Sequence, residues 1–83
     1  MSIFVGMTDK FMSGWGPAEG KTNQYVIECE TEEQAQQIER AAAARPEMER
    51  VMRRGTEPKS NSGTLVSLVQ FKDLGEIWTG GVK

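Results

Sequence analysis

Residues 23–44 read NQYVIECETEEQAQQIERAAAA, and this stretch decides the fold because a strand pattern passes directly into a helix pattern. Over 23–30, apolar residues alternate with polar ones, the period of two that is typical of a half-buried strand. The residues on the apolar side are Tyr25, Ile27 and Cys29. Val26 is the one apolar residue on the polar side. The stretch therefore predicts a strand over 23–30 with one face in the core.

The helix pattern begins with a capping motif. Thr31 is followed three residues later by Gln34, the spacing at which a hydroxyl and an amide each satisfy a free backbone N–H of the first turn. Glu32 and Glu33 favour the same start, because carboxylates interact favourably with the positive end of the helix dipole. One apolar stripe follows, formed by Ala35, Ile38, Ala41 and Ala42. We expect a helix from Thr31 to about Ala44 that packs on a sheet.

The segments on either side predict further strands and loops. Ile3 to Met12 has the composition of one extended piece, or of two with a bend. Residues 13–22, SGWGPAEGKT, contain three glycines and a proline and predict a loop. Pro46 disfavours helix at the residue before it, so the helix either stops there or restarts as a separate turn over 46–50. We expect another extended segment over 51–54.

The last third of the chain predicts a turn and one more strand. Gly55, Pro58 and the SNSG of 60–63 indicate a long turn. Residues 64–72, TLVSLVQFK, are rich in β-branched and apolar residues and predict the most buried strand. Trp78 either docks as an edge segment or lies in a fraying tail. Together the elements predict a single α+β domain over 1–83, with a mostly antiparallel sheet of three to five strands and one main helix on one face.

The composition excludes several classes of protein. The chain has 83 residues, of which 37% are hydrophobic and 27% charged, and a formal net charge of −2. That charge provides no general attraction to nucleic acid or to an acidic membrane. A single cysteine, the lack of a signal-peptide pattern and the lack of a long apolar run together predict a protein of the cytoplasm.

The residue types that catalysis and metal binding need are sparse. The chain has no histidine, and its one cysteine cannot build a thiolate metal site. Cys29 lies on the side of Tyr25 and Ile27, which favours a place in the core over a role as nucleophile. Residues 16–22, GPAEGKT, approach a phosphate-binding loop, but Trp15 stands where its first glycine should be. We therefore expect no enzymatic activity, no cofactor and no metal.

The candidate partner-binding residues are two charged clusters and one tryptophan. The acidic cluster is either ordinary helix capping and a solvated edge, or a patch that faces a partner's cations; it comprises Glu28, Glu30, Glu32 and Glu33. The basic cluster comprises Arg45, Arg50, Arg53 and Arg54, and Lys59 belongs to the same run of cations. Trp15 stands between two glycines and either plugs the end of a thin core or projects as a binding anchor. No aromatic residue lies between Tyr25 and Phe71 to stack on bases, so nucleic-acid binding is the second hypothesis.

Residues 10–48 resemble a family of small uncharacterised proteins encoded by bacteriophages and other mobile elements. In that family a Lys-Phe-Met-Ser-Gly-Trp-Gly opening precedes Gly-Lys-x-Asn, a strand ending in Cys, a helix and an Arg-x-Glu-Met close. The residues that fit are Lys10, Phe11, Ser13, Gly14, Trp15, Gly16, Gly20, Lys21, Asn23, Cys29, Arg45 and Met48. From Glu49 onward the match is less clear.

This resemblance implies phage or prophage origin, and small phage proteins of this kind often block host defence. The leading hypothesis is an anti-CRISPR protein that binds a bacterial effector complex in the host cytoplasm and blocks it sterically, as a monomer or homodimer. The alternative is a phage accessory protein that contacts nucleic acid in replication or transcription. A structural virion or dimerisation component is a third class.

Overall fold

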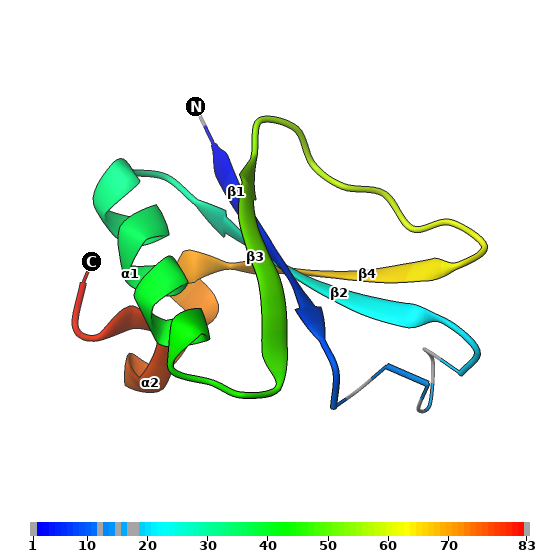
Figure 1. Cartoon of the computed structure of the whole chain (residues 1–83). Coiled ribbons are helices and arrows are strands. Elements are labelled where there is room, and N and C mark those ends of the chain that lie inside the picture. Colours follow the sequence, from blue (N-terminus) through cyan, green and yellow to red (C-terminus); the bar gives the residue numbers. More distant parts are fainter. Residues whose placement is uncertain (1, 12, 15, 17–18, 83) are drawn as a thin grey trace.

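In the computed structural model, which describes residues 2–11, 13–14, 16 and 19–82, the elements follow one another as β1-β2-α1-β3-β4-η2-α2 (Figure 1). The strands are β1 (Ile3–Asp9), β2 (Thr22–Cys29), β3 (Met48–Arg54) and β4 (Thr64–Gln70). The helical elements are α1 (Glu32–Ala43), the 3-10 helix η2 (Phe71–Asp73), which is one turn long, and the short α2 (Glu76–Thr79). The predicted α+β fold, with one main helix, is confirmed.

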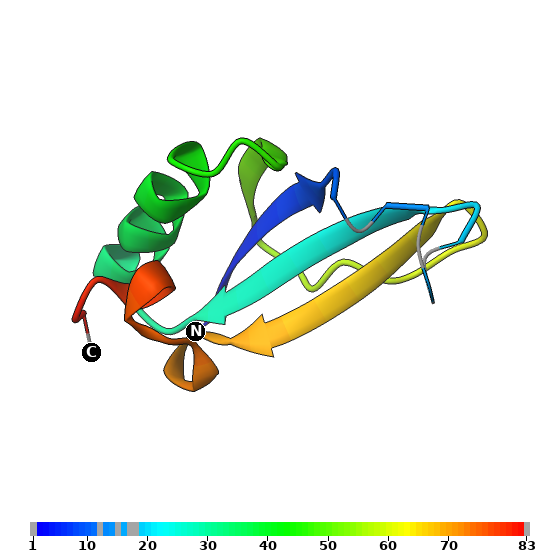
Figure 2. The same ribbon diagram turned by 90° about the horizontal axis from the view of Figure 1, so that it is seen from below.

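The four strands form one mixed sheet in the order β3-β1-β2-β4. β1 is antiparallel to both of its neighbours, β2 and β3. β4 is parallel to β2, and the two arrows point the same way in Figure 2. The expectation of a mostly antiparallel sheet therefore holds for β1 and its two neighbours but not for β4. The parallel pair arises because residues 55–63 carry the chain from one edge of the sheet to the other before β4 begins.

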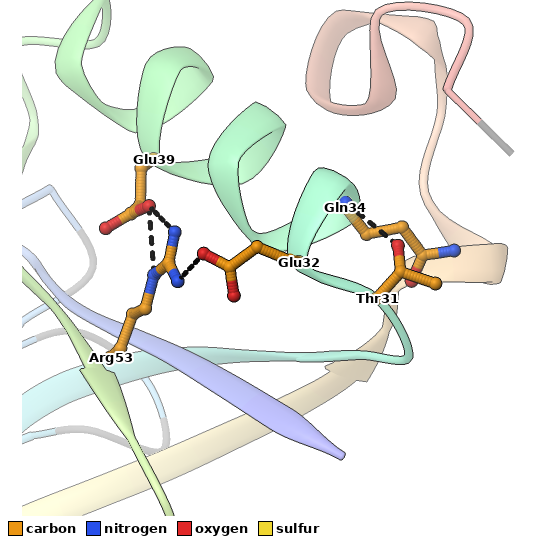
Figure 3. A network of polar contacts seen from close by, with 5 residues as sticks. All are labelled: Thr31, Glu32, Gln34, Glu39 and Arg53. Atoms are coloured by element: carbon orange, nitrogen blue, oxygen red, sulfur yellow. Dashed lines mark hydrogen bonds and ion pairs between the residues drawn. The ribbon is translucent and has the colours of Figure 1, made fainter. Parts of the chain in front are cut away.

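The predicted capping motif starts α1, but the side chain of Gln34 accepts from a different backbone N–H than the motif predicts. Thr31 Oγ1 accepts from the backbone N–H of Gln34 at 3.1 Å (Figure 3). The Gln34 amide oxygen reaches back to the backbone N–H of Glu30 at 2.7 Å, one residue before the capping threonine. Both ends of the motif thus remove unsatisfied donors where β2 passes into α1.

The core lies between α1 and one face of the sheet. α1 packs on β1, β2 and β3 and against α2, and the apolar residues that it covers are buried. They are Val5, Met7, Ile27, Cys29, Ala35, Ile38, Ala42 and Phe71. The predicted apolar side of β2 and most of the predicted helix stripe are therefore confirmed. No helix among the described residues is long and apolar enough to cross a membrane.

Cys29 is fully buried, as predicted for a core residue. Burial raises the pKa of its thiol from 9.0 to about 11, because the thiolate loses its hydration in the core. The unfolded chain therefore loses the thiol proton at lower pH than the folded chain does. Stability that is fully present below about pH 9 is lost as the pH rises toward 11.

We expect this thiol to lower the free energy of unfolding by roughly 2 to 3 kcal/mol between about pH 9 and about pH 11. Urea unfolding of the wild type and of Cys29→Ala across this range measures the contribution. The variant should lose less stability with rising pH than the wild type. If the free energy of unfolding fell equally with pH in the two proteins, the buried thiol of Cys29 would not be the cause of the loss.

β3 begins earlier than the sequence predicted, and it contains a bulge. The chain turns at 46–47 and enters the strand at Met48, where a separate helical turn was one of the two expectations. Gly6 pairs with Met52 but Thr8 pairs with Glu49, so β3 has one residue more than β1 between these pairs. The bulge lets Met48 and Val51, three positions apart, both pack on the core.

Arg50 lies in this bulge with φ of 55°, a left-handed conformation that non-glycine residues seldom adopt. Arg50→Gly is expected to raise the free energy of unfolding by up to about 1 kcal/mol, and Arg50→Val to lower it by about 1 to 2 kcal/mol. Glu49→Gly is the matched control, because the same change in a regular strand position should be destabilising. Chemical denaturation measures all three. A stability loss at Arg50→Gly equal to that of Glu49→Gly would contradict the role of the bulge.

The prediction that residues 64–72 form the most buried strand is wrong. β4 is an edge strand whose residues are only partly buried, whereas β1 lies in the middle of the sheet and is almost entirely buried. Trp78 was expected in an edge segment or a fraying tail, but it lies in α2. Its ring packs on Tyr25 with centroids 5.7 Å apart, and the guanidinium group of Arg45 lies 4.9 Å from the ring centre.

Candidate partner-binding surface

The sheet turns one face toward α1, and we call the opposite face, which none of the described helices covers, the open face. Its side chains stand in three rows, because residues paired across neighbouring strands point to the same side. The middle row crosses all four strands and consists of Met52, Gly6, Val26 and Leu68. The rows beside it consist of Arg54, Phe4, Glu28 and Gln70, and of Glu49, Thr8, Gln24 and Val66.

The middle row is apolar from one edge of the sheet to the other. Val26 at its centre is fully buried, while Met52 and Leu68 at its ends are 47% and 39% exposed. Gly6 leaves room in the row, and the side chain of Arg54 lies over it. The Arg54 Nε is 3.3 Å, and the Cδ 3.7 Å, from the position that a Cβ would take on Gly6. The middle row of the open face is thus an apolar strip with an arginine lying across it.

Arg54 is not neutralised within the described part of the chain, where no carboxylate pairs with it. The neighbouring Arg53 makes a useful contrast, because strand alternation sends it to the other face. There it donates to Glu39 Oε1 through Nε at 3.1 Å and Nη2 at 2.7 Å, and to Glu32 through Nη1 (Figure 3). Hydrogen bonds to Glu39 and then Glu32 raise the pKa of Arg53.

Hydrogen bonds hold the polar residues on either side of the apolar row. Gln24 Nε2 donates to Thr8 Oγ1 at 3.0 Å. The carboxylate of Glu28 accepts from Ser2 Oγ and from Gln70 Nε2, both at 2.6 Å. These two bonds, led by that from Ser2, lower the pKa of Glu28. Glu28 is therefore ionised at neutral pH and already has hydrogen-bond donors of its own.

A pocket of about 270 Å³ lies where the 55–63 loop meets the open face. Pro58, Lys59 and Asn61 line it from the loop, and Gln24, Arg54, Thr64 and Val66 from the sheet. The polar side chains among the described lining residues are two cations, two amides and a hydroxyl, and none of them is a carboxylate. Lys59 Nζ contacts Glu57 Oε2 at 3.2 Å at an exposed position beside the pocket. The pocket continues the apolar strip, since Val66 borders both.

The outer edge of β4 is closed at its start and open at its end. The N–H groups of Thr64 and Val66 point away from β2 and donate to the Asn61 carbonyl and to Ser60 Oγ. Because N–H direction alternates along a strand, those of Leu68 and Gln70 point outward too. No described residue accepts from either of them. The edge at Leu68 and Gln70 can therefore pair with a strand from outside.

The four acidic residues singled out by the sequence do not share one surface. Glu28 lies on the open face, whereas Glu32 lies on α1 and pairs with Arg53 (Figure 3). Glu30 and Glu33 are exposed where β2 passes into α1. Glu32 of the acidic cluster and Arg53 of the basic cluster therefore pair with each other within the chain.

The four arginines are also dispersed. Arg45 lies over Trp78 and pairs with Glu47 at 3.0 Å, and Arg50 is exposed in the β3 bulge. Arg53 faces α1, and of the four only Arg54 lies on the open face. Trp15 is outside the described residues, so both hypotheses for its indole stay predictions.

Lys59 was singled out with the arginines, but several residues of this surface were not recognised from the sequence, namely Gly6, Met52, Val66 and Leu68. The run TLVSLVQ carried a signal, because it has apolar residues on both faces of a strand and only one of those faces can lie toward the helix. Which strands would lie beside it depended on register, and the bulge at Arg50 changes that register.

Comparison of the chain with protein-family models, with curated proteins and with solved structures found no match. Within the described ranges, no group of three or more His, Cys, Asp or Glu residues is placed to hold a metal ion.

Proposed function

We propose that this chain is a binding protein that inhibits a bacterial defence complex by covering part of its surface, and that its contact surface is the open face with the free edge of β4. The target class, a CRISPR effector complex in the host cytoplasm, rests on the resemblance of residues 10–48 to phage-encoded proteins. The inhibitor needs no cofactor, because covering part of the surface of the defence complex is sufficient to block that complex.

The observation that carries the proposal is the apolar middle row of the open face. Met52 and Leu68 leave apolar surface exposed at the two ends of this row, on either side of the buried Val26, and a partner that covers them removes that surface from water. The row spans three strand spacings, or roughly 14 Å, and so could form the apolar centre of an interface of about 800 Å² per partner. Glu28 and Gln24, held by hydrogen bonds within the chain, supply a polar rim.

Arrangement of the arginines favours protein over nucleic acid as the partner. A nucleic-acid surface needs several unpaired cations on one face to follow the phosphates. Here Arg53 pairs with two carboxylates and Arg45 with one, and neither lies on the open face with Arg54. The arrangement therefore favours a protein partner over nucleic acid.

Reconstitution with purified effector complexes of several CRISPR types tests the proposal. The chain is expected to co-elute stoichiometrically with one of them in size-exclusion chromatography and to stop its cleavage of target DNA. Light scattering of the free chain gives its oligomeric state for the stoichiometry. If no complex is bound, and a labelled single strand binds instead with an affinity that falls steeply with salt, the proposal is wrong.

A further inference from the structure

We infer that the pocket between the 55–63 loop and the open face binds a carboxylate group of the partner protein, carried by a segment with apolar side chains beside it. This inference rests on the proposed function and adds the chemistry of the partner. The ligand atoms are two carboxylate oxygens, from an Asp or Glu side chain or from a chain end.

The polar lining of the pocket provides hydrogen-bond donors and positive charge. Arg54 offers a planar guanidinium group, which matches the two oxygens of a carboxylate. Lys59 brings a second positive charge, and Gln24, Asn61 and Thr64 bring polar groups. Among the described residues, no carboxylate lines the pocket or pairs with Arg54, so a carboxylate of the partner can pair with this arginine.

The surroundings of the pocket distinguish a carboxylate on a protein from a phosphate on a nucleic acid. Val66 and Pro58 line the pocket itself, and the apolar row from Leu68 to Met52 runs beside it. A sugar-phosphate backbone would meet this row with further charges that have no partners there. An extended peptide can instead place one acidic side chain on Arg54 and apolar side chains on the row.

The free edge of β4 offers a way to hold such a peptide. The outward N–H groups of Leu68 and Gln70 are available to a strand that lies alongside. Such a strand would lie along β4, with alternate side chains on the open face, and one of them would extend the apolar row beyond Leu68.

Selection of random displayed peptides on the immobilised full chain tests the inference without knowledge of the partner. Enriched peptides are expected to share an Asp or Glu next to aliphatic residues. For one such synthetic peptide, Arg54→Gln should weaken binding by about 10- to 100-fold, the usual effect of losing a charge-assisted hydrogen bond. Glu57→Gln should strengthen binding, because it releases Lys59.

Arg53→Gln is the matched control, since it removes the same charge from the adjacent residue but on the opposite face; it should leave peptide binding unchanged. Peptides without acidic residues, or equal losses at Arg53→Gln and Arg54→Gln, would overturn the inference. So would single-stranded DNA binding that Arg54→Gln abolishes. If the wild type blocks an effector complex and Arg54→Gln blocks it equally well, the inference fails while the proposed function stands. If acidic peptides bind as expected but no effector complex does, the proposal that the target is a CRISPR effector fails, while the inference that the pocket binds a carboxylate stands.

Discussion

Phe71→Ala is expected to lower the free energy of unfolding by about 3 to 5 kcal/mol, a large share of what a domain of this size has. Phe71 is 4% exposed and lies in η2, directly after β4, where its ring belongs to the same buried cluster as Ile27 and Ile38. Because η2 is a single turn, little backbone is available to collapse into the space that the ring leaves. Urea denaturation followed by circular dichroism measures the loss.

Phe11→Ala is the control for this prediction, because the same atoms are removed from a side chain that is 74% exposed. Its effect should stay within about 0.5 kcal/mol. Similar denaturation midpoints for the two variants would mean that η2 does not close the core.

The double substitution Met52→Glu and Leu68→Glu is expected to weaken partner binding by about 100-fold or more, because central apolar contacts dominate the energy of an interface. Both residues stand at the ends of the apolar row, and both are partly exposed in the free chain. Their replacement should therefore change the free energy of unfolding by less than about 1 kcal/mol. Titration calorimetry with the effector complex that the chain binds measures the loss of affinity, and thermal melting measures the change in stability.

Ile77→Glu is the control for this surface. Ile77 is 79% exposed but lies in α2, away from the open face, so its replacement should leave binding intact. Retained affinity in the double variant, or an equal loss in Ile77→Glu, would place the contact surface elsewhere on the chain.

The elements that the sequence predicted correctly are those with local signals. The alternation of Tyr25, Ile27 and Cys29 placed β2, and Thr31 with Gln34 placed the start of α1, because both patterns involve residues close together in the chain. The apolar run at 64–70 was recognised as a strand but assigned to the middle of the sheet. Composition shows that a strand is apolar, but it does not show which strands lie beside it.

The candidate surface could be predicted only in part for the same reason. Arg54 was singled out with Arg45, Arg50 and Arg53 because they are close in sequence, although strand alternation alone separates Arg53 from Arg54. The row through Gly6 and Leu68 joins residues from distant parts of the chain. It exists because the parallel pairing of β2 with β4 and the antiparallel pairing of β1 with β2 coincide in register.

The central place of β1 in the sheet constrains how the chain folds. β1 and β2 are neighbours along the chain and can form a hairpin early. β3 pairs with β1 across a longer stretch of chain, which includes β2 and α1. β4 must then reach the far side of that hairpin. Such distant pairings slow the search for the native state, so we expect refolding over milliseconds to seconds and not microseconds. We expect the two outer strands to pair last and to open first, and amide hydrogen exchange can follow the opening strand by strand.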